Sequence, residues 1–235
     1  MNAKKLSKRL QTVASFVPTG AIVAVIGSDH AYLPCYLVMN GIAKGAIAGE
    51  VVKGPYESAE RQVRTEGLTD QIKVRLADGL AAVKIDDHVD TVTIAGMGGP
   101  LIVSILEKHP ESLESVTRLI LQPNIHAKVI REWALNNNWA IHDEVILEED
   151  DKIYEVIVLQ RGAMTLTEEE LLLGPILLKR QNDAFKLKWT KEIANWERVQ
   201  QAIENAERTV ENEEKLQELA HLIQLVEGAM HSRKL

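Results

Sequence analysis

The feature that most constrains the fold is an alternation of short apolar runs with longer mixed stretches over the first part of the chain. Ala21–Ile26 (AIVAVI) is the clearest run, and its unbroken apolar pattern is typical of a strand buried on both faces. The further strands predicted in this way are Gly45–Gly49, Ile72–Ala77, Thr91–Ala95 and Arg118–Leu121. Helices are predicted between the strands, ending near Asn40 and covering about 52–66, 100–108 and 125–137. Strands that alternate with helices imply a parallel sheet with right-handed crossovers.

Two longer β-rich runs follow, Trp139–Leu147 and Lys152–Gln160. The acidic residues 148–151 join them, and so short a link cannot cross over to make a parallel pair. We therefore predict an antiparallel hairpin with a solvated acidic turn. Five parallel units closed by a hairpin is the order found in class I methyltransferases, which is at this point an analogy of fold.

The two ends of the chain carry helical patterns. Residues 3–17 have apolar side chains at spacings of three and four before Pro18, which predicts an amphipathic helix. From Met164 the strand pattern ends, and similar spacings predict helices over about 176–208 and 213–230. We expect these two to form an antiparallel hairpin, with a single long helix left open because TVENEE is a weak loop signal. The predicted domains are residues 1–163 (α/β) and 164–235 (helical coiled coil).

Composition limits the class of protein. Apolar residues make up 46% and charged residues 26%, which excludes wholesale disorder. The single cysteine, Cys35, excludes an intrachain disulfide, and in its apolar helix we expect it to be inert. We find no secretory signal pattern, no membrane-spanning run and no metal-ligand spacing among the histidines, so we expect a cytoplasmic protein without a metal.

Unusual short sequences directly follow the predicted strands. They are GSDH (27–30), GE (49–50), ADG (77–79), AGMGG (95–99) and QPN (122–124). Ligands of open parallel sheets bind at the carboxyl ends of the strands, so we place the site there. The first turn lacks G-x-G-x-x-G, which disfavours a nicotinamide dehydrogenase.

The first two turns carry acids. Gly27-Ser28-Asp29 lets the backbone approach a ligand at a helix N-terminus. Asp29 would repel a pyrophosphate and suits a cationic ammonium or sulfonium group, unless it is simply an N-cap. Glu50 can accept hydrogen bonds from both hydroxyls of a ribose. The alternative is that Glu50 is a solvated loop acid.

The next two turns suit a flat ring. Asp78-Gly79 can bind the exocyclic amine of an adenine, although Asp-Gly is also common in ordinary turns. The glycines of Gly96–Gly99 imply close approach of the backbone to a neighbouring group. Met97 can lie against a ring, unless it is a core residue.

Amide and aromatic side chains complete the candidate site. Gln122-Pro123-Asn124 offers donors and acceptors for a base edge, and Asn124 can alternatively or also cap the next helix. His30 and Tyr32 can stack on a base, with a purely structural role as the alternative for the histidine.

With these residues the sequence resembles the bacterial TrmK family, which methylates N1 of adenine 22 in tRNA with S-adenosylmethionine. The resemblance covers most of residues 3–160, and the helical tail is similar to the coiled coil of the family. The matching segments are LSKRLQTVASFVP (6–18), IGSDHAYLP (26–34), GAIAGE (45–50), TIAGMGG (93–99), LILQPNIHAKVIREW (119–133) and DEVILEEDDKIYEVIVL (143–159).

The resemblance implies a class I Rossmann-like methyltransferase domain with a C-terminal helical hairpin, S-adenosylmethionine as cofactor and tRNA as partner. The implied cofactor residues are Gly27, Ser28, Asp29, Glu50, Val51, Asp78, Gly79, Gly96, Met97 and Gly98. The implied base pocket consists of His30, Tyr32, Gln122, Pro123 and Asn124, with Tyr154 as a further candidate. We expect a monomer, and leave open a dimer formed through the helical hairpin.

One position departs from the family pattern, which has an acid two residues before Gly27 where this chain has Val25. The acid helps to fix the methionine end of the cofactor in class I methyltransferases. Losing one charge-assisted hydrogen bond costs roughly 1.5–3 kcal/mol, so we predict weaker cofactor binding than in a typical member. Val25 also supports an alternative function, a tRNA-binding module that has weakened or lost catalysis. A small-molecule methyltransferase is a third reading, but it would not need the helical hairpin.

The net charge of −7 argues at first sight against a nucleic-acid partner. However, the basic residues are segregated from the acids, and their distribution matters more for phosphate contacts than the sum. We predict that tRNA contacts two basic groups, one in the first helix and one at the start of the helical hairpin. These residues are Lys4, Lys5, Lys8, Arg9, Lys179, Arg180, Lys186 and Lys188.

Overall fold

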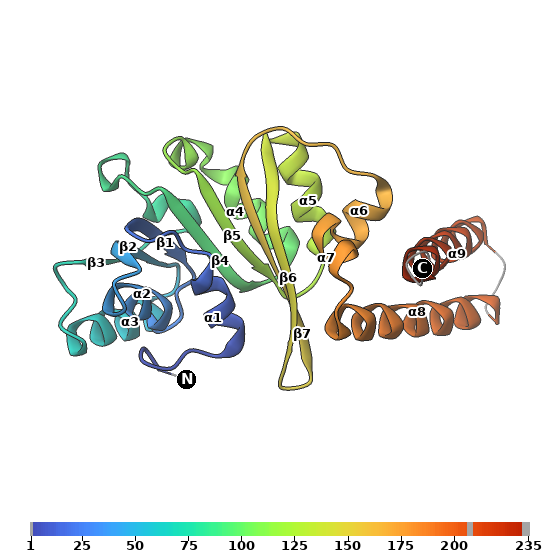
Figure 1. The fold of residues 1–235 in the computed structure, drawn as a ribbon, viewed down its shortest axis with the longest axis horizontal. Helices are drawn as coiled ribbons and strands as arrows, with labels where there is room; N and C mark the ends of the chain where they lie inside the picture. The colour runs from blue at the N-terminus through green and yellow to red at the C-terminus, as the bar shows by residue number, and fades with distance from the viewer. Residues whose placement is uncertain (1, 206–208, 232–235) are drawn as a thin grey trace. The chain divides into compact units, whose positions relative to one another are not determined.

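The structure, a computed structural model, describes residues 2–205 and 209–231. Within these residues the chain forms a seven-stranded sheet in the order β3-β2-β1-β4-β5-β7-β6 (Figure 1). The strands are β1 Ala21–Ile26, β2 Ala43–Glu50, β3 Ile72–Leu76, β4 Thr91–Met97, β5 Arg118–Pro123, β6 Trp139–Glu149 and β7 Lys152–Arg161. The helices are α1 Lys8–Ser15, α2 Tyr32–Met39, α3 Lys53–Thr65, α4 Gly99–Lys108, α5 Ala127–Asn136, α6 Glu168–Leu173, α7 Pro175–Arg180, α8 Asp183–Glu204 and α9 Val210–His231.

The strand pairing confirms the predicted parallel sheet with an antiparallel closure. Strands β1 to β5 pair parallel to their neighbours, and β7 pairs antiparallel to β5. Asp150 and Asp151, at φ angles of 50° and 60°, join β6 to β7 in the two-residue turn that hairpin twist favours. The chain reverses its direction of travel through the sheet between β1 and β4, and this switch point is where open parallel sheets bind ligands.

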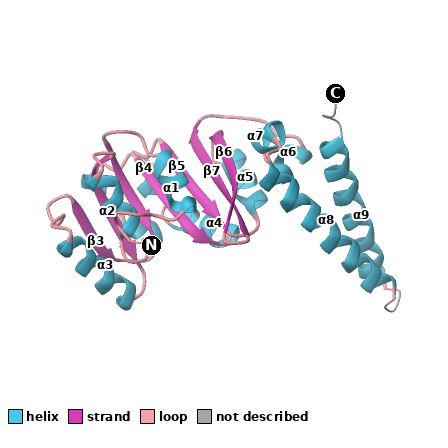
Figure 2. Ribbon diagram, turned by 60° about the horizontal axis from the view of Figure 1, so that its bottom comes forward, coloured by secondary structure: helices cyan, strands magenta, loops and turns pink. Residues whose placement is uncertain are grey.

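Helices cover both faces of the sheet (Figure 2). On one face α4 and α5 pack on the strands around fully buried residues such as Ile94, Ile102 and Ile130. Helices α1, α2 and α3 lie on the opposite face, where Val13, Cys35 and other apolar side chains are buried. This burial raises the pKa of the Cys35 thiol to about 12, as expected for an inert core cysteine.

A buried ion network ties α5 to the hairpin. Arg131 Nε donates to Glu144 Oε1 at 2.8 Å and Arg131 Nη2 donates to Glu155 Oε2 at 2.7 Å, and all three side chains are buried. Removing one partner of such a network is strongly destabilising because it leaves a buried charge uncompensated. No local sequence pattern indicates this network, because its members come from three separate elements.

The predicted first helix over 3–17 is too long. Helix α1 begins at Lys8 because Ser7 is its N-cap, with Oγ accepting from the Leu10 N–H. Upstream, Asn2 Oδ1 accepts from the backbone N–H groups of Lys4 and Lys5 and holds a turn there instead of a helical turn.

The predicted helix over 176–208 is also wrong, because two helices, α7 and α8, occupy most of this range. Gln181 between them has a φ of 40°, and the Asn182 side chain caps α8 by accepting from the Phe185 N–H. Helix α6 was not predicted, and residues 206–208 of the expected helix lie outside the described part of the chain. Most of TVENEE, expected as a loop, belongs to α9.

The chain divides into two compact units. One unit, here called the sheet unit, comprises residues up to Val145 together with Tyr154–Thr165. The other, the helical unit, comprises Ile146–Ile153 together with the residues from Leu166. The division into functional domains at 163/164 stays a prediction, and the hairpin tip groups with the helices.

Within the helical unit α8 and α9 run antiparallel, as predicted. Gln200 Nε2 donates to Leu216 O, whereas Gln181 Nε2, just before α8, donates to Ala229 O near the end of α9. The core of the unit consists of Ile146, Leu173, Leu177, Leu178, Phe185, Trp189, Val226 and Ala229. In the part of the chain that the structure describes, no helix has both the length and the hydropathy to cross a membrane.

Candidate active site

The carboxyl ends of β1, β2, β4 and β5 bring four of the predicted turns to one edge of the sheet. Gly27 N–H donates to Gly49 O at 2.9 Å, which joins the turns after β1 and β2. A side chain on Gly27 would come within 2.4 Å of Met97 Cε, so Met97 lies against the first turn. Asn124 N–H donates to Met97 O at 2.8 Å and joins the turns after β4 and β5.

The turn after β1 has an unusual backbone. Asp29, His30 and Ala31 have φ angles of 36°, 61° and 55°, all in the left-handed region. This conformation costs roughly 1–2 kcal/mol per residue for side chains other than glycine, and such strain clusters at functional sites. Ala31 is the N-cap of α2 and no side chain caps this helix, so the alternative of Asp29 as an N-cap is wrong.

Glu50 ends β2 as a buried carboxylate. Its residue is only 6% exposed, and Ser28 Oγ donates to its Oε1 at 2.6 Å. The alternative of a solvated loop acid is therefore wrong. A buried carboxylate held by a hydroxyl at a strand end is an oriented hydrogen-bond acceptor.

Asp78 and Gly79 lie in the turn after β3. The Asp78 carboxylate accepts from Lys108 Nζ at the end of α4, and this hydrogen bond holds the pKa of Asp78 below its usual range. Gly79, at a φ of 55°, opens a short 3-10 turn, Gly79–Ala82. An adenine amine would therefore have to share Asp78 with Lys108, a contact that no local sequence pattern indicates.

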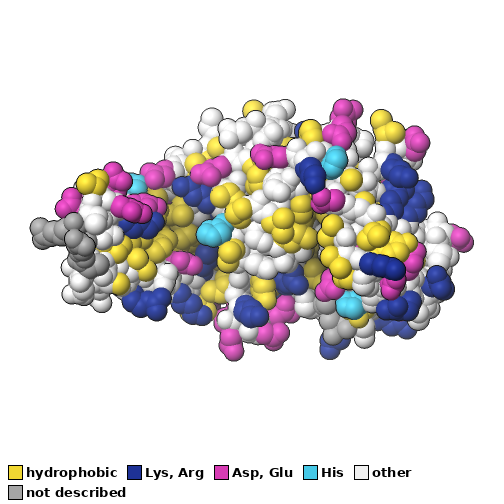
Figure 3. Space-filling view, turned by 180° about the vertical axis from the view of Figure 1, so that it is seen from behind, with side chains coloured by type: hydrophobic (Ala, Val, Ile, Leu, Met, Phe, Trp, Pro, Cys, Tyr) yellow, Lys and Arg dark blue, Asp and Glu magenta, His cyan; other side chains and the backbone are white. Residues whose placement is uncertain are grey.

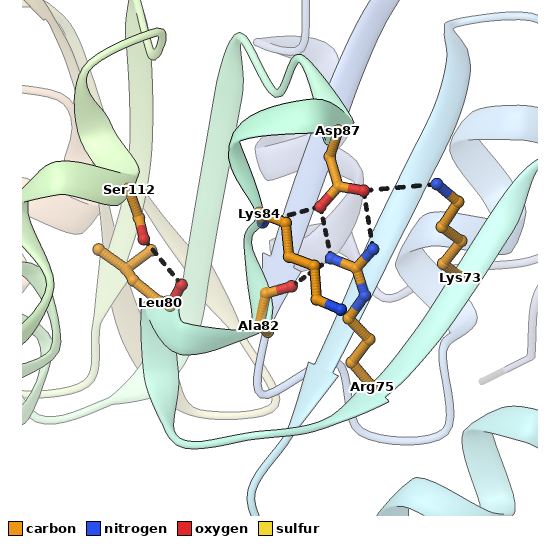
Figure 4. Close-up of polar contacts among 7 residues, drawn as sticks. All are labelled: Lys73, Arg75, Leu80, Ala82, Lys84, Asp87 and Ser112. Atoms are coloured by element: carbon orange, nitrogen blue, oxygen red, sulfur yellow. Dashed lines mark hydrogen bonds and ion pairs between the residues drawn. The ribbon is translucent and has the colours of Figure 1, made fainter.

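A second polar cluster, centred on Arg75 and Asp87, holds the end of this 3-10 turn (Figure 4). The Arg75 guanidinium donates to both carboxylate oxygens of Asp87 and to Ala82 O, and the Lys84 N–H donates to Asp87 at 2.8 Å. These contacts, led by the hydrogen bond from Arg75, lower the pKa of Asp87 to about 2. Ser112 Oγ also donates to Leu80 O at 3.1 Å.

Two amide side chains, Gln122 at the end of β5 and Asn124 directly after it, are linked by hydrogen bonds. Gln122 is fully buried, its Oε1 accepts from the Gly96 N–H at 2.9 Å, and its Nε2 donates to Pro123 O at 2.9 Å and to Asn124 Oδ1 at 3.3 Å. Asn124 Nδ2 donates to Gly96 O at 2.9 Å. The N-cap of α5 is His126 with no side-chain cap, so Asn124 does not cap that helix.

His30 and Tyr32 form a stacked pair at the start of α2. Their ring centroids are 5.5 Å apart at an interplanar angle of 21°. His30 Nδ1 is 2.6 Å from Ser58 Oγ on α3, and half of the His30 side chain is exposed. His30 thus makes a structural hydrogen bond to α3 and at the same time leaves part of its ring exposed for stacking.

The glycines after β4 serve different purposes. A side chain on Gly99 would lie 2.2 Å from His126 O, so this glycine allows α4 to pack closely against the turn before α5. A side chain on Gly98 would meet no atom nearer than 3.8 Å, so packing within the chain does not demand glycine there.

Comparison with known proteins decides the family. The family model described as tRNA (adenine(22)-N(1))-methyltransferase, TrmK, matches residues 23–228. The chain belongs to this family. The predicted resemblance and the class I methyltransferase fold are thereby confirmed.

Relatives of the TrmK family are similar to this chain over nearly its whole length. The tRNA (adenine(22)-N(1))-methyltransferase of Bacillus subtilis (strain 168) is 50% identical over 232 residues, which cover 96% of this chain and 97% of the relative. The crystal structure of the B. subtilis M1A22 tRNA methyltransferase TrmK matches with a TM-score of 0.92 at 48% identity, covering 97% and 99% of the two chains. A Streptococcus pneumoniae protein solved in complex with S-adenosyl-L-methionine matches with a TM-score of 0.89 at 45% identity, covering 97% and 100%.

The basic residues before and within α1 differ from one another in this TrmK-family protein. Lys4, Lys5 and Lys8 are exposed, Lys4 and Lys5 in the turn held by Asn2. Arg9 is only partly exposed, and its Nη1 donates to Gln122 Oε1 in the site. Arg9 was predicted to contact tRNA together with the lysines. Its contact with Gln122 was not predicted, because residues 9 and 122 lie far apart in the chain.

The basic residues of the helical unit lie on α7 and α8. Lys179, Arg180 and Lys186 are exposed, whereas Lys188 Nζ lies 4.5 Å from the centroid of the Trp189 ring. The face drawn in Figure 3 carries basic, acidic and apolar side chains in separate small groups, so neither sign of charge dominates it. Among the described residues, no group of three or more His, Cys, Asp or Glu side chains is placed to hold a metal ion.

Val25, the departure from the TrmK family pattern, is buried in β1 at 4% exposure. Its register partner in β4 is Thr93. Thr93 Oγ1 is a buried atom for which the described residues offer no hydrogen-bond partner. A buried hydroxyl without a partner is unusual, and this one lies beside Val25.

Proposed function

We propose that this protein transfers the methyl group of S-adenosylmethionine to N1 of adenine 22 in tRNA. One observation carries the proposal: in a chain of the TrmK family, a buried carboxylate and a set of neutral amides meet at the same sheet edge. Glu50 supplies the carboxylate, and Gln122 and Asn124 supply the amides. A carboxylate suits a ribose, and amides suit a base edge.

The residues at the ends of β1 and β2 fit S-adenosylmethionine, which when bound supplies an electrophilic methyl group on a sulfonium. Glu50, oriented by Ser28, accepts from the ribose hydroxyls. Asp29 is exposed beside the strained turn and offers its carboxylate to the cationic end. Val51, 64% exposed next to Glu50, offers an apolar contact to the adenine ring.

Other cofactor contacts follow from the turns after β3 and β4. Met97 lies against Gly27 of the first turn, and Gly98 follows it in the chain. Gly96, on the other side of Met97 in the chain, is bound to Gln122. Asp78 and Gly79 face the adenine end, where Asp78 shares its carboxylate with Lys108.

The chemistry needs no strong base. The lone pair of N1 forms the new N–C bond while the S–C bond breaks and its electron pair returns to sulfur. The protein acts by placing N1 in line with the methyl group at near-attack distance. N1 is hidden in a paired or stacked base, so the target adenine has to be exposed or flipped into the site.

The base contacts follow from the turn after β5 and the start of α2. Asn124 and Gln122 bind the base edge beside Pro123, and the His30–Tyr32 pair stacks on the ring. The methylated base is cationic, and amide oxygens stabilise it without being ionised themselves. A proton leaves later from the exocyclic amine to water.

The exposed lysines contact the phosphates of tRNA. They are Lys4, Lys5 and Lys8 in the sheet unit and Lys179 and Lys186 in the helical unit. We place the protein in the cytoplasm because its substrate is tRNA. The alternative of a tRNA-binding module without catalysis has only Val25 in its favour, and no comparison supports it.

The test is transfer of a tritiated methyl group to unmodified tRNA, compared with the same tRNA in which adenine 22 is replaced by guanine. We expect transfer to the first and none to the second, and a primer-extension stop at position 22. Transfer to the guanine variant at the same rate would refute the assigned target. Tight tRNA binding without any transfer would instead favour the binding module.

A further inference from the structure

Arg9 stands apart from the basic residues around it. It lies on α1, directly after the exposed Lys8, but its own side chain is only partly exposed. Helix α1 is anchored over β5, because Arg118 Nη1 donates to Phe16 O at 2.9 Å at the end of the helix. Arg9 therefore sits on a held segment and reaches from it toward the end of the same strand.

Contacts with Gln122, Tyr154 and the Gly96 backbone show where the Arg9 guanidinium lies. Its Nη1 donates to Gln122 Oε1, and its Cζ lies 5.3 Å from the centroid of the Tyr154 ring. A side chain on Gly96 would come within 3.4 Å of Arg9 Nη1, so the guanidinium lies directly beside the Gly96 backbone. Gly96 itself has a φ of 79°, so a substitution there would strain the backbone next to the guanidinium.

These contacts determine which end of the Gln122 amide is the acceptor. Gln122 Oε1 accepts from both Arg9 and the Gly96 N–H, whereas its NH₂ group donates to Pro123 O and Asn124 Oδ1. Rotating the amide by half a turn would place its NH₂ group against two donors. An unpaired buried donor is costly, so this orientation is held.

The orientation is passed on to Asn124. Since Asn124 Oδ1 accepts from Gln122 Nε2, its Nδ2 is left to donate, and it does so to Gly96 O at 2.9 Å. An amide oxygen has two lone pairs, so Asn124 Oδ1 can accept one further hydrogen bond. At the base edge adenine presents an amine donor at position 6, where guanine presents an acceptor.

We propose that Arg9 is a positioning residue that fixes the polarity of the Gln122 and Asn124 amides, so that the pocket accepts the 6-amine of adenine and leaves N1 free to attack. Arg9 also couples the pocket to tRNA docking, because the phosphate-binding lysines are on the same segment. This inference rests on the proposed function and deepens it.

The test separates positioning from phosphate binding. The variants are Arg9→Ala and Arg9→Lys, compared with Lys8→Ala on the same helix and Arg64→Ala, an exposed arginine at the end of α3. For each, single-turnover methylation with enzyme in excess is measured with saturating cofactor, together with tRNA affinity as a function of salt. Cofactor binding by calorimetry and thermal melting report on folding.

A positioning role predicts that Arg9→Ala lowers the single-turnover rate about tenfold to a hundredfold, while cofactor affinity and the salt slope of tRNA binding stay at wild-type values. Arg9→Lys keeps the charge but has no planar fork for Gln122 and Tyr154, so it also loses rate. Lys8→Ala gives the opposite signature, with a salt slope smaller by about one unit. Arg64→Ala behaves as wild type in both assays.

The proposal is overturned if Arg9→Ala keeps the wild-type single-turnover rate, or if Arg9→Lys restores rate and salt slope fully, as an ordinary phosphate contact would. If Arg9→Ala melts early, Arg9→Lys decides through the same rate measurement. If wild-type protein itself methylates no tRNA in this assay, the proposed function fails. If it does so and the Arg9 variants match it, only this inference fails.

Discussion

The two halves of the candidate site are built from different chemistry. The half formed by the ends of β1 and β2 contains a buried carboxylate, Glu50, beside a strained turn with the exposed Asp29. The half formed by the ends of β4 and β5 contains neutral amides linked by hydrogen bonds, Gln122 and Asn124. In the proposed function, the negatively charged half binds the sulfonium and the ribose hydroxyls. The neutral half binds the base, which must keep its own lone pair for attack.

Because the two halves differ in this way, cofactor affinity and the methyl-transfer rate should be separable by mutation. Substitutions in one half should change one of these quantities and leave the other at its wild-type value.

The largest effect is expected for Asn124→Ala in the amide half. The variant loses a base-edge contact and the hydrogen bond to Gly96 O, so N1 is no longer held in line. We expect the single-turnover rate to fall about a hundredfold, because a misplacement of the reacting atoms by about 1 Å lowers a rate by roughly that factor. Calorimetry should show unchanged cofactor affinity, and a full rate would remove Asn124 from the mechanism.

Glu50→Gln tests the carboxylate half. The change removes the charge from a buried acceptor while keeping its shape, which weakens ribose binding by roughly 1.5–3 kcal/mol, or about tenfold to a hundredfold in affinity. The measurement is calorimetry with S-adenosylmethionine. The matched control is Glu57→Gln, an exposed glutamate on α3, which should bind the cofactor as wild type does. Equal affinity of both variants would dissociate Glu50 from the cofactor.

Substituting the three exposed lysines Lys4, Lys5 and Lys8 with glutamate should weaken tRNA binding and flatten its dependence on salt. Each lost phosphate contact reduces the slope by about 0.7–0.9, so the loss of affinity at low salt is tenfold or more. Cofactor affinity should not change. A salt slope equal to that of wild type would place the tRNA elsewhere.

Val25→Asp should strengthen cofactor binding by about tenfold, the gain from one charge-assisted hydrogen bond. Thr93 Oγ1, buried beside position 25, can donate to the introduced carboxylate and so reduce the cost of burying it. Val25→Asn is the control that adds polarity without charge. Calorimetry decides, and an unchanged dissociation constant for Val25→Asp means that the position does not matter here.

The smallest effect on catalysis is expected for a change outside the site, which acts instead on stability at acidic pH. The pKa of Asp87 is lowered to about 2 in the folded protein, so its contribution is present above the ordinary value near 4 and is lost as the pH falls toward about 2. Asp87→Asn should lower the free energy of unfolding by about 2 kcal/mol at about pH 7. Thermal melting should show the gap closing on acidification. A gap that stays constant would show that the Arg75 pair contributes nothing.

The sequence predicted the strands and the turns that carry chemistry because both depend on local patterns. The run at Ala21–Ile26 matches β1 residue for residue, and the turns after β1, β2, β4 and β5 meet as expected. The predicted helix boundaries were wrong where a single polar side chain sets the first residue of the helix. Ser7 does so for α1, and Asn182 does so for α8.

The contacts that orient the site could not be predicted, because they join residues far apart in the chain. No local sequence pattern indicates these pairs, which are Arg9 with Gln122, Lys108 with Asp78, and Arg131 with Glu144. The structure was also needed to decide between alternative roles. Asp29 and Asn124 could have been helix caps, and Glu50 could have been a solvated acid, and the fold excludes all three.

The central claim is that neutral groups position N1 and that no side chain acts as a general base. The most direct test is the single-turnover rate of tRNA methylation between about pH 6 and 9, with enzyme and cofactor saturating. The account predicts a rate that does not vary over this range, because the N1 lone pair is available throughout. A rate that rises tenfold per pH unit and then levels off would show a titrating base and would contradict it.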